Sequence, residues 1–145
     1  MDKYREIRPI VLGLAIRDGK LLVSECYDRT RNLTFYRCIG GGIEFLEKSA
    51  NALKREFKEE INVDIIVKEY LGMTENIFTF EGRNGHELVL FYSIEIPENQ
   101  YQDVYTVYEA DDPEGRNERR AMWISLNEFK NHERVLYPDD VFKYI

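Results

Sequence analysis

Residues 40–63 read GGGIEFLEKSANALKREFKEEINV and combine a glycine run, a helical pattern and a cluster of acids. Near the end of the helical part, Glu56, Glu59 and Glu60 lie within about one turn of each other, behind Arg55. Like charges three and four residues apart on a helix repel each other unless a cation neutralises them. The whole chain already carries a net charge of −7, so this stretch predicts a bound cation.

The helix is expected to begin near residues 47–49, with Ser49 as its N-cap, and to end at Asn62. Asparagine tolerates the left-handed backbone conformation that commonly follows a helix. Four apolar residues recur at helical spacing and predict the buried stripe: Ala50, Leu53, Phe57 and Ile61. The three acids flank this stripe and therefore border the core.

Carboxylates clustered in this way favour a hard cation, because Mg²⁺ and Mn²⁺ prefer oxygen ligands and often share them with substrate phosphates. Zinc is not indicated, since the cysteines and histidines have no metal-binding spacing. A glycine-rich loop before the helix allows the backbone to approach a ligand closely. Together these features suit metal-assisted attack of water on a phosphate.

The spacing of this stretch resembles the signature of the Nudix hydrolases. Gly41 is followed by five residues, Glu47, seven residues and then REFKEEINV over 55–63. The family has glycine where this chain has Asn62, and many members have glycine where it has Leu46. The direct match covers 23 residues, and the Trp-containing stretch MWISLNEF near the C-terminus is also similar to the family. The resemblance implies an α+β fold, an α/β/α sandwich around a mixed, mainly antiparallel curved sheet, in one domain over residues 1–145.

The resemblance also implies site residues. In the family, the acids corresponding to Glu56, Glu59 and Glu60 bind Mg²⁺, for which Mn²⁺ can substitute, and the carbonyl corresponding to that of Gly40 often adds a ligand. Glu47 and Arg55 correspond to a structural pair, in which Arg55 would orient the catalytic carboxylates.

The general base varies across the family, and three assignments stay open here: Glu118, Glu87 or one of the three helix glutamates. Glu44 either contacts metal or substrate or lies exposed in its loop. Arg37 and Arg31, with Arg29, flank the glycine run and are candidates to receive substrate phosphates, although the last two also fit a solvated loop. Several aromatic residues fit either base stacking or ordinary packing: Tyr27, Phe35, Tyr36, Phe78, Phe80 and Tyr92.

The reaction that this resemblance implies is hydrolysis of the diphosphate linkage in a nucleoside diphosphate joined to another moiety. The main alternative is a non-catalytic nucleotide or ADP-ribose sensor of the same fold. A more distant alternative is an isomerase of isoprenoid diphosphates, which would need a catalytic histidine and a catalytic cysteine such as Cys26 or Cys38. The identity of the substrate is left open, because specificity depends on loops outside the signature.

Composition limits the class of protein and the partners that this chain is expected to have. A length of 145 residues with 43% hydrophobic residues predicts one globular domain. The sequence contains no apolar run long enough to cross a bilayer and no apolar signal region at its start, so a cytoplasmic protein is expected. The acidic balance argues against stable nucleic-acid or membrane binding. A homodimer is compatible with the resemblance, because many members dimerise through strands beyond the signature.

The remaining pattern predicts strands on both sides of the helix. They cover residues 6–17, 20–27, 34–39, 63–76, 77–81, 87–96 and 121–124. Turns are expected at 18–19 and 82–85. Ser125, with Glu128 three residues later, predicts the start of a further helix, and Asp139 is expected to cap a last short one. Residues 101–108 fit a strand or an ordered loop, and a charged loop is expected over residues 111–120.

Overall fold

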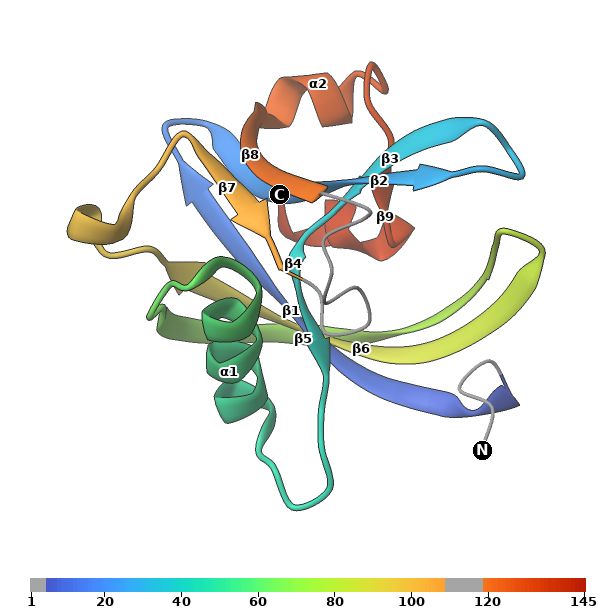
Figure 1. Ribbon diagram of the computed structural model, residues 1–145, viewed down its shortest axis with the longest axis horizontal. Coiled ribbons are helices and arrows are strands. Elements are labelled where there is room, and N and C mark those ends of the chain that lie inside the picture. The colour runs from blue at the N-terminus through green and yellow to red at the C-terminus, as the bar shows by residue number, and fades with distance from the viewer. Residues whose placement is uncertain (1–4, 109–118) are drawn as a thin grey trace.

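The computed structural model describes residues 5–108 and 119–145 (Figure 1). Its strands are β1 (Ile7–Arg17), β2 (Lys20–Asp28), β3 (Leu33–Arg37), β4 (Ile39–Gly42), β5 (Ile66–Phe80), β6 (Arg83–Glu95), β7 (Val104–Val107), β8 (Arg119–Ser125) and β9 (Leu136–Tyr137). Its helices are α1 (Ser49–Ile61), α2 (Leu126–Lys130) and two 3₁₀ segments, η2 (Glu98–Gln100) and η3 (Asp139–Tyr144).

The strands form one mixed sheet in the order β5-β6-β1-β2-β3-β9, with β4 paired to β1, β8 paired to β2, and β7 paired to β8. All the pairings are antiparallel except β1 with β6 and β3 with β9. The mainly antiparallel mixed sheet that the family resemblance implied is therefore confirmed. Asp18 and Gly19 both take positive φ, at 51° and 74°, and form the predicted two-residue turn between β1 and β2.

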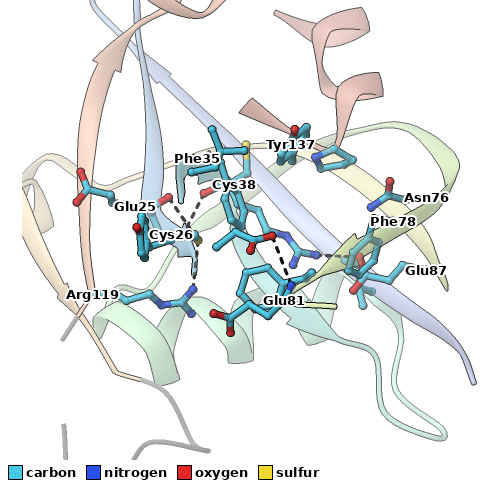
Figure 2. Close-up of a pocket in the computed structure, with 18 of the residues that line it drawn as sticks. Glu25, Cys26, Phe35, Cys38, Asn76, Phe78, Glu81, Glu87, Arg119 and Tyr137 are labelled. Carbon is cyan, nitrogen blue, oxygen red and sulfur yellow. Dashed lines mark hydrogen bonds and ion pairs between the residues drawn. The ribbon is translucent and has the colours of Figure 1, made fainter. Parts of the chain in front are cut away.

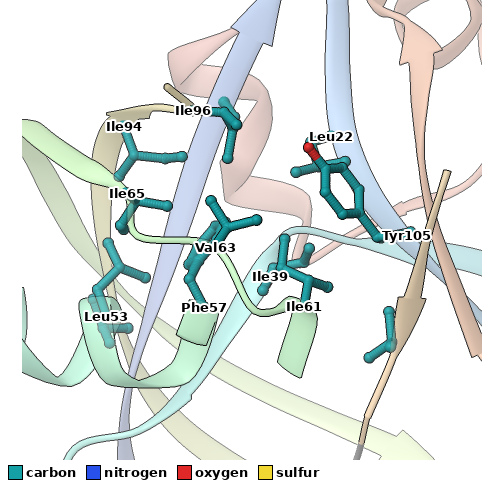
Figure 3. Packing of buried hydrophobic residues seen from close by; sticks show 14 of the residues in the cluster. Leu22, Ile39, Leu53, Phe57, Ile61, Val63, Ile65, Ile94, Ile96 and Tyr105 are labelled. Carbon is teal, nitrogen blue, oxygen red and sulfur yellow. The ribbon is translucent and has the colours of Figure 1, made fainter. Parts of the chain in front are cut away.

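Helix α1 lies over one part of the sheet, and the C-terminal segment with α2 and η3 lies over another (Figure 1). The apolar stripe of α1 buries Leu53, Phe57 and Ile61 against the sheet, as its spacing predicted, whereas Ala50 in the first turn stays partly exposed and Ala52 is buried instead. Figure 3 shows these side chains packed with Ile39 and Ile94. A second buried cluster includes Phe91, Phe129, Leu136 and Val141 and joins the sheet to the C-terminal segment. Helices thus cover both sides of the sheet, which gives the α+β sandwich.

The hairpin after α1 differs from the prediction. One strand, β5, replaces the two expected over 63–76 and 77–81, and the turn lies at Glu81 and Gly82 instead of 82–85. Both turn residues have positive φ, 50° and 79°, which is the geometry of a two-residue hairpin turn. Gly85 belongs to β6, where a Cβ would lie only 2.2 Å from the ring of Phe78. The glycine that suggested a turn instead makes room for an aromatic ring.

Two of the four predicted helix caps are confirmed. Asn62 ends α1 with left-handed φ and ψ of 57° and 45°, and the Oγ of Ser125 accepts a hydrogen bond from the N–H of Asn127 at the start of α2. Ser49 is the first residue inside α1, and its hydroxyl is bonded to that of Tyr92 at 2.6 Å. Asp139 makes no capping bond, since Pro138 occupies that position.

No helix in the part of the chain that the structure describes is long and apolar enough to cross a membrane.

Candidate active site

The glycine run places α1 against the sheet. Strand β4 pairs with β1, with Gly41 opposite Val11. A Cβ on Gly41 would lie 2.4 Å from the carboxyl carbon of Glu56, and one on Gly40 would lie 1.9 Å from the carbonyl oxygen of Val11. A side chain at either position would displace its neighbours. The glycines therefore let the carboxylate of Glu56 lie directly over the strand.

Arg55 ties the loop before the helix to the helix itself. Its Nε and Nη2 donate to the two carboxylate oxygens of Glu47 at 2.8 and 2.9 Å, and Nη2 also donates to the carbonyl of Gly42 at 2.9 Å. Its Nη1 donates to Glu56 at 3.0 Å and to Glu59 at 3.3 Å. Hydrogen bonds from Arg55 are the main reason that the pKa of Glu47 falls to about 2. This two-pronged pair, on a side chain that is mostly shielded from water, stiffens the loop.

The tip of this loop carries Leu46 at a φ of 66°, in the left-handed region that favours glycine. The N–H of Glu47 donates to the carbonyl of Glu44 at 3.0 Å, and the N–H of Glu44 donates to the carboxylate of Glu47 at 3.1 Å. The Glu44 side chain is exposed and lies 3.8 Å from Arg55. Glu44 is therefore a loop residue beside Arg55, outside the lining of the cleft described below.

The three helix glutamates face different surroundings. Glu59 is exposed, with 56% of its side chain accessible, whereas Glu56 is largely shielded. Burial, and then the charge of Glu56, raise the pKa of Glu60 to about 8, although Arg119, Arg37 and the N–H of Gly40 act in the opposite direction. Burial is also the main cause of the raised pKa of Glu56. Burial therefore disfavours the ionised forms of Glu56 and Glu60, despite the arginines beside them.

This donor set fits a hard divalent cation in its chemistry, since it offers three carboxylates beside a glycine backbone. Among residues 5–108 and 119–145, no group of three or more Asp, Glu, His or Cys side chains stands close enough to hold a metal ion. In this arrangement Nη1 of Arg55 donates to both Glu56 and Glu59. Metal binding would require these two carboxylates to exchange Arg55 for the cation.

A cleft of about 1170 Å³ begins at Gly40, Gly41 and Glu60 and extends between β3 and the β5–β6 hairpin. Its charged lining includes Arg37, a predicted substrate-binding residue, and Glu87. Its aromatic lining comprises Tyr27, Phe35, Phe78, Phe80 and Tyr137. Figure 2 shows Phe35 near Tyr137, with Phe78 and Glu87 together on another side of the cleft. Tyr36 and Tyr92 are absent from this lining, and both pack against the buried clusters.

Glu87 is almost fully buried and lies between two arginines. Arg37 donates from Nη2 to one of its carboxylate oxygens at 3.1 Å, and Nη1 of Arg8 lies 4.0 Å from the other. Strand β1 runs parallel to β6 with Arg8 paired to Glu87, and this pairing brings the two residues together. The geometry makes Glu87 an acceptor that orients Arg37 towards the cleft.

Sequence reasoning missed two arginines of the cleft, Arg8 and Arg119. Arg119 donates from Nη1 to the sulfur of Cys26 at 3.2 Å, and its charge acts on Glu60. Alternation along β1 places Arg8 on the same face as Ile10, but only the pairing of β1 with β6 shows that this face meets Glu87. Arg119 directly follows the undescribed segment, and the sequence had assigned it to a charged loop.

The other predicted residues are held in contacts of their own, are buried, or lie outside the described residues. Arg31 lines the cleft, but its guanidinium donates to the carbonyl of Thr79 at 2.8 Å. Glu118 lies outside the described residues. Both cysteines are buried, and burial raises the pKa of Cys38 to about 12. A thiol so hard to ionise is a poor nucleophile, which argues against Cys38 as the catalytic cysteine of the isomerase alternative.

Comparisons with known proteins bear on the fold and family. A family model described as the NUDIX domain matches residues 7–143. A NUDIX hydrolase from Nitrosomonas europaea is 17% identical, with 95% of this chain and 85% of that chain covered at a TM-score of 0.64. The MutT protein of a methicillin-resistant Staphylococcus aureus is 22% identical, with 94% and 91% covered at 0.53.

A UDP-X diphosphatase is 14% identical, with 87% of this chain and 54% of that chain covered at a TM-score of 0.53. Comparison with the curated proteins finds no match. The solved structures share the fold at low identity, whereas the family model spans nearly the whole chain and includes the stretch that surrounds Arg55. The chain therefore belongs to the Nudix family.

Proposed function

We propose that this protein is a metal-dependent pyrophosphohydrolase. It cleaves the diphosphate linkage of a nucleoside diphosphate joined to another moiety, and water is the attacking group. The observation that carries this proposal is the continuity of the cleft, whose arginine-bearing lining begins at Glu60 and the glycine strand. An acidic protein that receives a diphosphate needs both arginines and a metal ion at the same place. Membership of the Nudix family and the names of the similar structures support the same reaction class.

The metal-holding residues in this proposal are Glu56, Glu59 and Glu60, with the carbonyl of Gly40. Mg²⁺ is the expected ion, and Mn²⁺ can replace it. When bound, such an ion would lower the pKa of a water molecule and neutralise charge on the diphosphate. The raised pKa of Glu60 supports this assignment, because burial, and then the charge of Glu56, disfavour the ionised carboxylate unless a cation lies beside it.

The chain's own residues bind and orient the substrate. Arg37, together with Arg8 and Arg119, contributes guanidinium donors that suit phosphate oxygens. Glu87 holds Arg37 in position through the 3.1 Å hydrogen bond. Arg55 and Glu47 keep the loop against α1 and thereby hold the backbone of Gly42 and the carboxylate of Glu56 in register.

A hydrolysis screen tests the proposal. Diphosphate compounds that include oxidised nucleotides, ADP-ribose, dinucleoside polyphosphates and nucleotide sugars are incubated with Mg²⁺ or Mn²⁺, and phosphate is measured after a coupled phosphatase. The double variant Glu59→Gln, Glu60→Gln should lose at least about a hundredfold in turnover and keep its fold by circular dichroism. Glu95→Gln is the control, because it alters an exposed carboxylate that pairs with Lys68. Full activity of the double variant would refute the site assignment.

The residue that activates water is tested separately. Glu118→Gln and Glu87→Gln are compared by pH–rate profiles, in which loss of the acid limb marks the general base. If Glu87 only orients Arg37, its variant should raise KM more than it lowers kcat. If neither variant changes the acid limb, one of the helix glutamates is the base. Tight nucleotide binding with no metal-dependent phosphate release would instead favour the sensor alternative.

A further inference from the structure

Two hairpin tips that are about fifty residues apart in the sequence are joined at the outer part of the cleft. The turn after β2 contributes Arg29, whose N–H and Nε both donate to the carboxylate of Glu81 at 3.1 Å. Arg31 donates from Nη2 to the carbonyl of Thr79 at 2.8 Å, and the N–H of Glu81 donates to Asp28 at 3.4 Å. We call this group of Asp28, Arg29, Arg31 and Glu81 the clasp. All four residues line the cleft.

Asp28 anchors the clasp. It is 2% exposed, and one carboxylate oxygen accepts the N–H groups of Thr30 at 2.9 Å and Arg31 at 3.1 Å. Burial alone would raise the pKa of Asp28, but the N–H groups of Arg31, Glu81 and Thr30 together lower it. The ionised carboxylate thus shapes its own turn and also accepts a bond from the opposite hairpin. A buried acceptor shared by two segments holds them at one separation.

Glu81 is an unusual residue for its position. It takes a φ of 50° in a two-residue turn, where Asn, Asp or Gly is preferred. The turn itself gains nothing from a long side chain there. The contact that this side chain makes is the one with Arg29 across the cleft. The backbone strain at Glu81 therefore accompanies a bond between the two walls.

The walls that the clasp joins carry the aromatic residues. On β5, residues 76, 78 and 80 all line the cleft, and they run from the position paired with Glu87 outwards to the tip. Glu87 lies four strand residues from Arg83, which borders the turn at Glu81, and this separation is about 13 Å along β6. Phe35 on β3 meets Phe80 edge to face with ring centroids 6.0 Å apart. The clasp stands beyond this contact and closes the same gap.

We propose that the clasp is a positioning element for the group attached to the diphosphate. It holds the β3 wall and the β5–β6 wall at the separation at which Phe35 and Phe80 keep their edge-to-face contact and, with Phe78, present an aromatic surface for a planar aromatic group to stack against. The clasp does not touch the reacting phosphates. The inference rests on the proposed function in this respect: the diphosphate lies near Glu60 and Arg37, and the attached aromatic group extends towards the tips.

The test variant is Glu81→Asn. It converts the turn to Asn-Gly, the pair most favourable for a two-residue hairpin, and removes the carboxylate that Arg29 holds. The matched control is Thr79→Val, which removes the hydroxyl bond from Thr79 to Asn84 in the same hairpin. This control keeps the shape of the side chain and the backbone carbonyl that accepts from Arg31.

Two measurements are made on both variants and on the unmodified protein. In Glu81→Asn, amide hydrogen exchange should speed up about tenfold at Arg29 and Arg31, although these residues lie in the hairpin that was not mutated. In Thr79→Val, exchange at both residues should stay unchanged. Binding is measured with AMP and with inorganic pyrophosphate, both with Mg²⁺. Affinity for AMP should fall roughly three- to tenfold in Glu81→Asn, whereas affinity for pyrophosphate should not change. With a hydrolysed substrate, KM should rise by the same factor at constant kcat.

The outcomes separate the two proposals. If Glu81→Asn matches Thr79→Val in both exchange and AMP affinity, the clasp has no positioning role. If affinity for pyrophosphate falls as much as that for AMP, the effect is a general loosening of the site, and the inference is again wrong. An unmodified protein that binds AMP but hydrolyses no diphosphate refutes the proposed function alone. One that binds neither AMP nor pyrophosphate refutes both.

Discussion

Replacing Glu60 with glutamine should stabilise the metal-free protein at alkaline pH, even though it removes a proposed metal ligand. In the folded chain, Glu60 lies beside Glu56 and is shielded from water, and these two causes raise its pKa from 4.5 to about 8. Between these values the native state binds one more proton than the unfolded state. Stability therefore falls as pH rises through this window, and above it the native protein carries an ionised, poorly solvated carboxylate.

The size of the effect follows from the same numbers. Each tenfold change in proton affinity corresponds to about 1.4 kcal/mol, so the full difference is about 5 kcal/mol. Because Glu60 keeps partial contact with solvent, we expect roughly half of this, about 2 to 3 kcal/mol. Glutamine keeps the shape and can still accept a bond from the N–H of Gly40, but it carries no charge.

The assay is urea unfolding in the presence of a chelator at about pH 5, 7 and 9. The free energy of unfolding of Glu60→Gln should equal that of the parent near pH 5 and exceed it by about 2 to 3 kcal/mol near pH 9. Glu59→Gln is the control, because its side chain is exposed and should show no such gain. Excess Mg²⁺ should reverse the order by binding the parent more tightly. A difference between Glu60→Gln and the parent that does not vary with pH would refute the reasoning.

Two further predictions concern the loop before α1. Arg55→Lys keeps the charge but loses the two-pronged bond to Glu47 and the bond to Gly42. The free energy of unfolding should fall by about 1 to 2 kcal/mol, with a larger loss in turnover than in substrate affinity, and an unchanged melting temperature and kcat would contradict this. Leu46→Gly should stabilise the protein by about 1 kcal/mol and raise its melting temperature by a few degrees, because it relieves a positive φ. The Leu46 side chain is 91% exposed, so no packing is lost, and a lower melting temperature would show that Leu46 has a stabilising contact.

Much of the fold was predictable because local rules and tertiary packing agree. The stripe of Leu53, Phe57 and Ile61 is buried as its spacing required, and Asn62 adopts the left-handed conformation that ends the helix. The turn at residues 18–19 also followed from residue type. The β5–β6 turn was placed wrongly because Gly85 serves a neighbouring ring, Phe78, and residue type alone does not distinguish that use from a turn.

Some features of the site were also predictable from residues close in the sequence, and others were not. The spacing from Gly41 to Val63 by itself determined the family, the acidic cluster and the expected pairing of Glu47 with Arg55, because all of these depend on residues close in the chain. It did not determine that Arg55 also holds Glu56 and Glu59.

Only the tertiary structure decided which residues meet across the cleft. The parallel pairing of β1 with β6 brings Arg8 to Glu87, and the approach of two hairpin tips brings Arg29 to Glu81. Strand pairing and hairpin contact join residues separated by fifty or more positions, and no local periodicity encodes such a meeting. The reaction class can therefore be predicted from the sequence of one helix and its loop, whereas the shape of the cleft follows from the packing of the sheet.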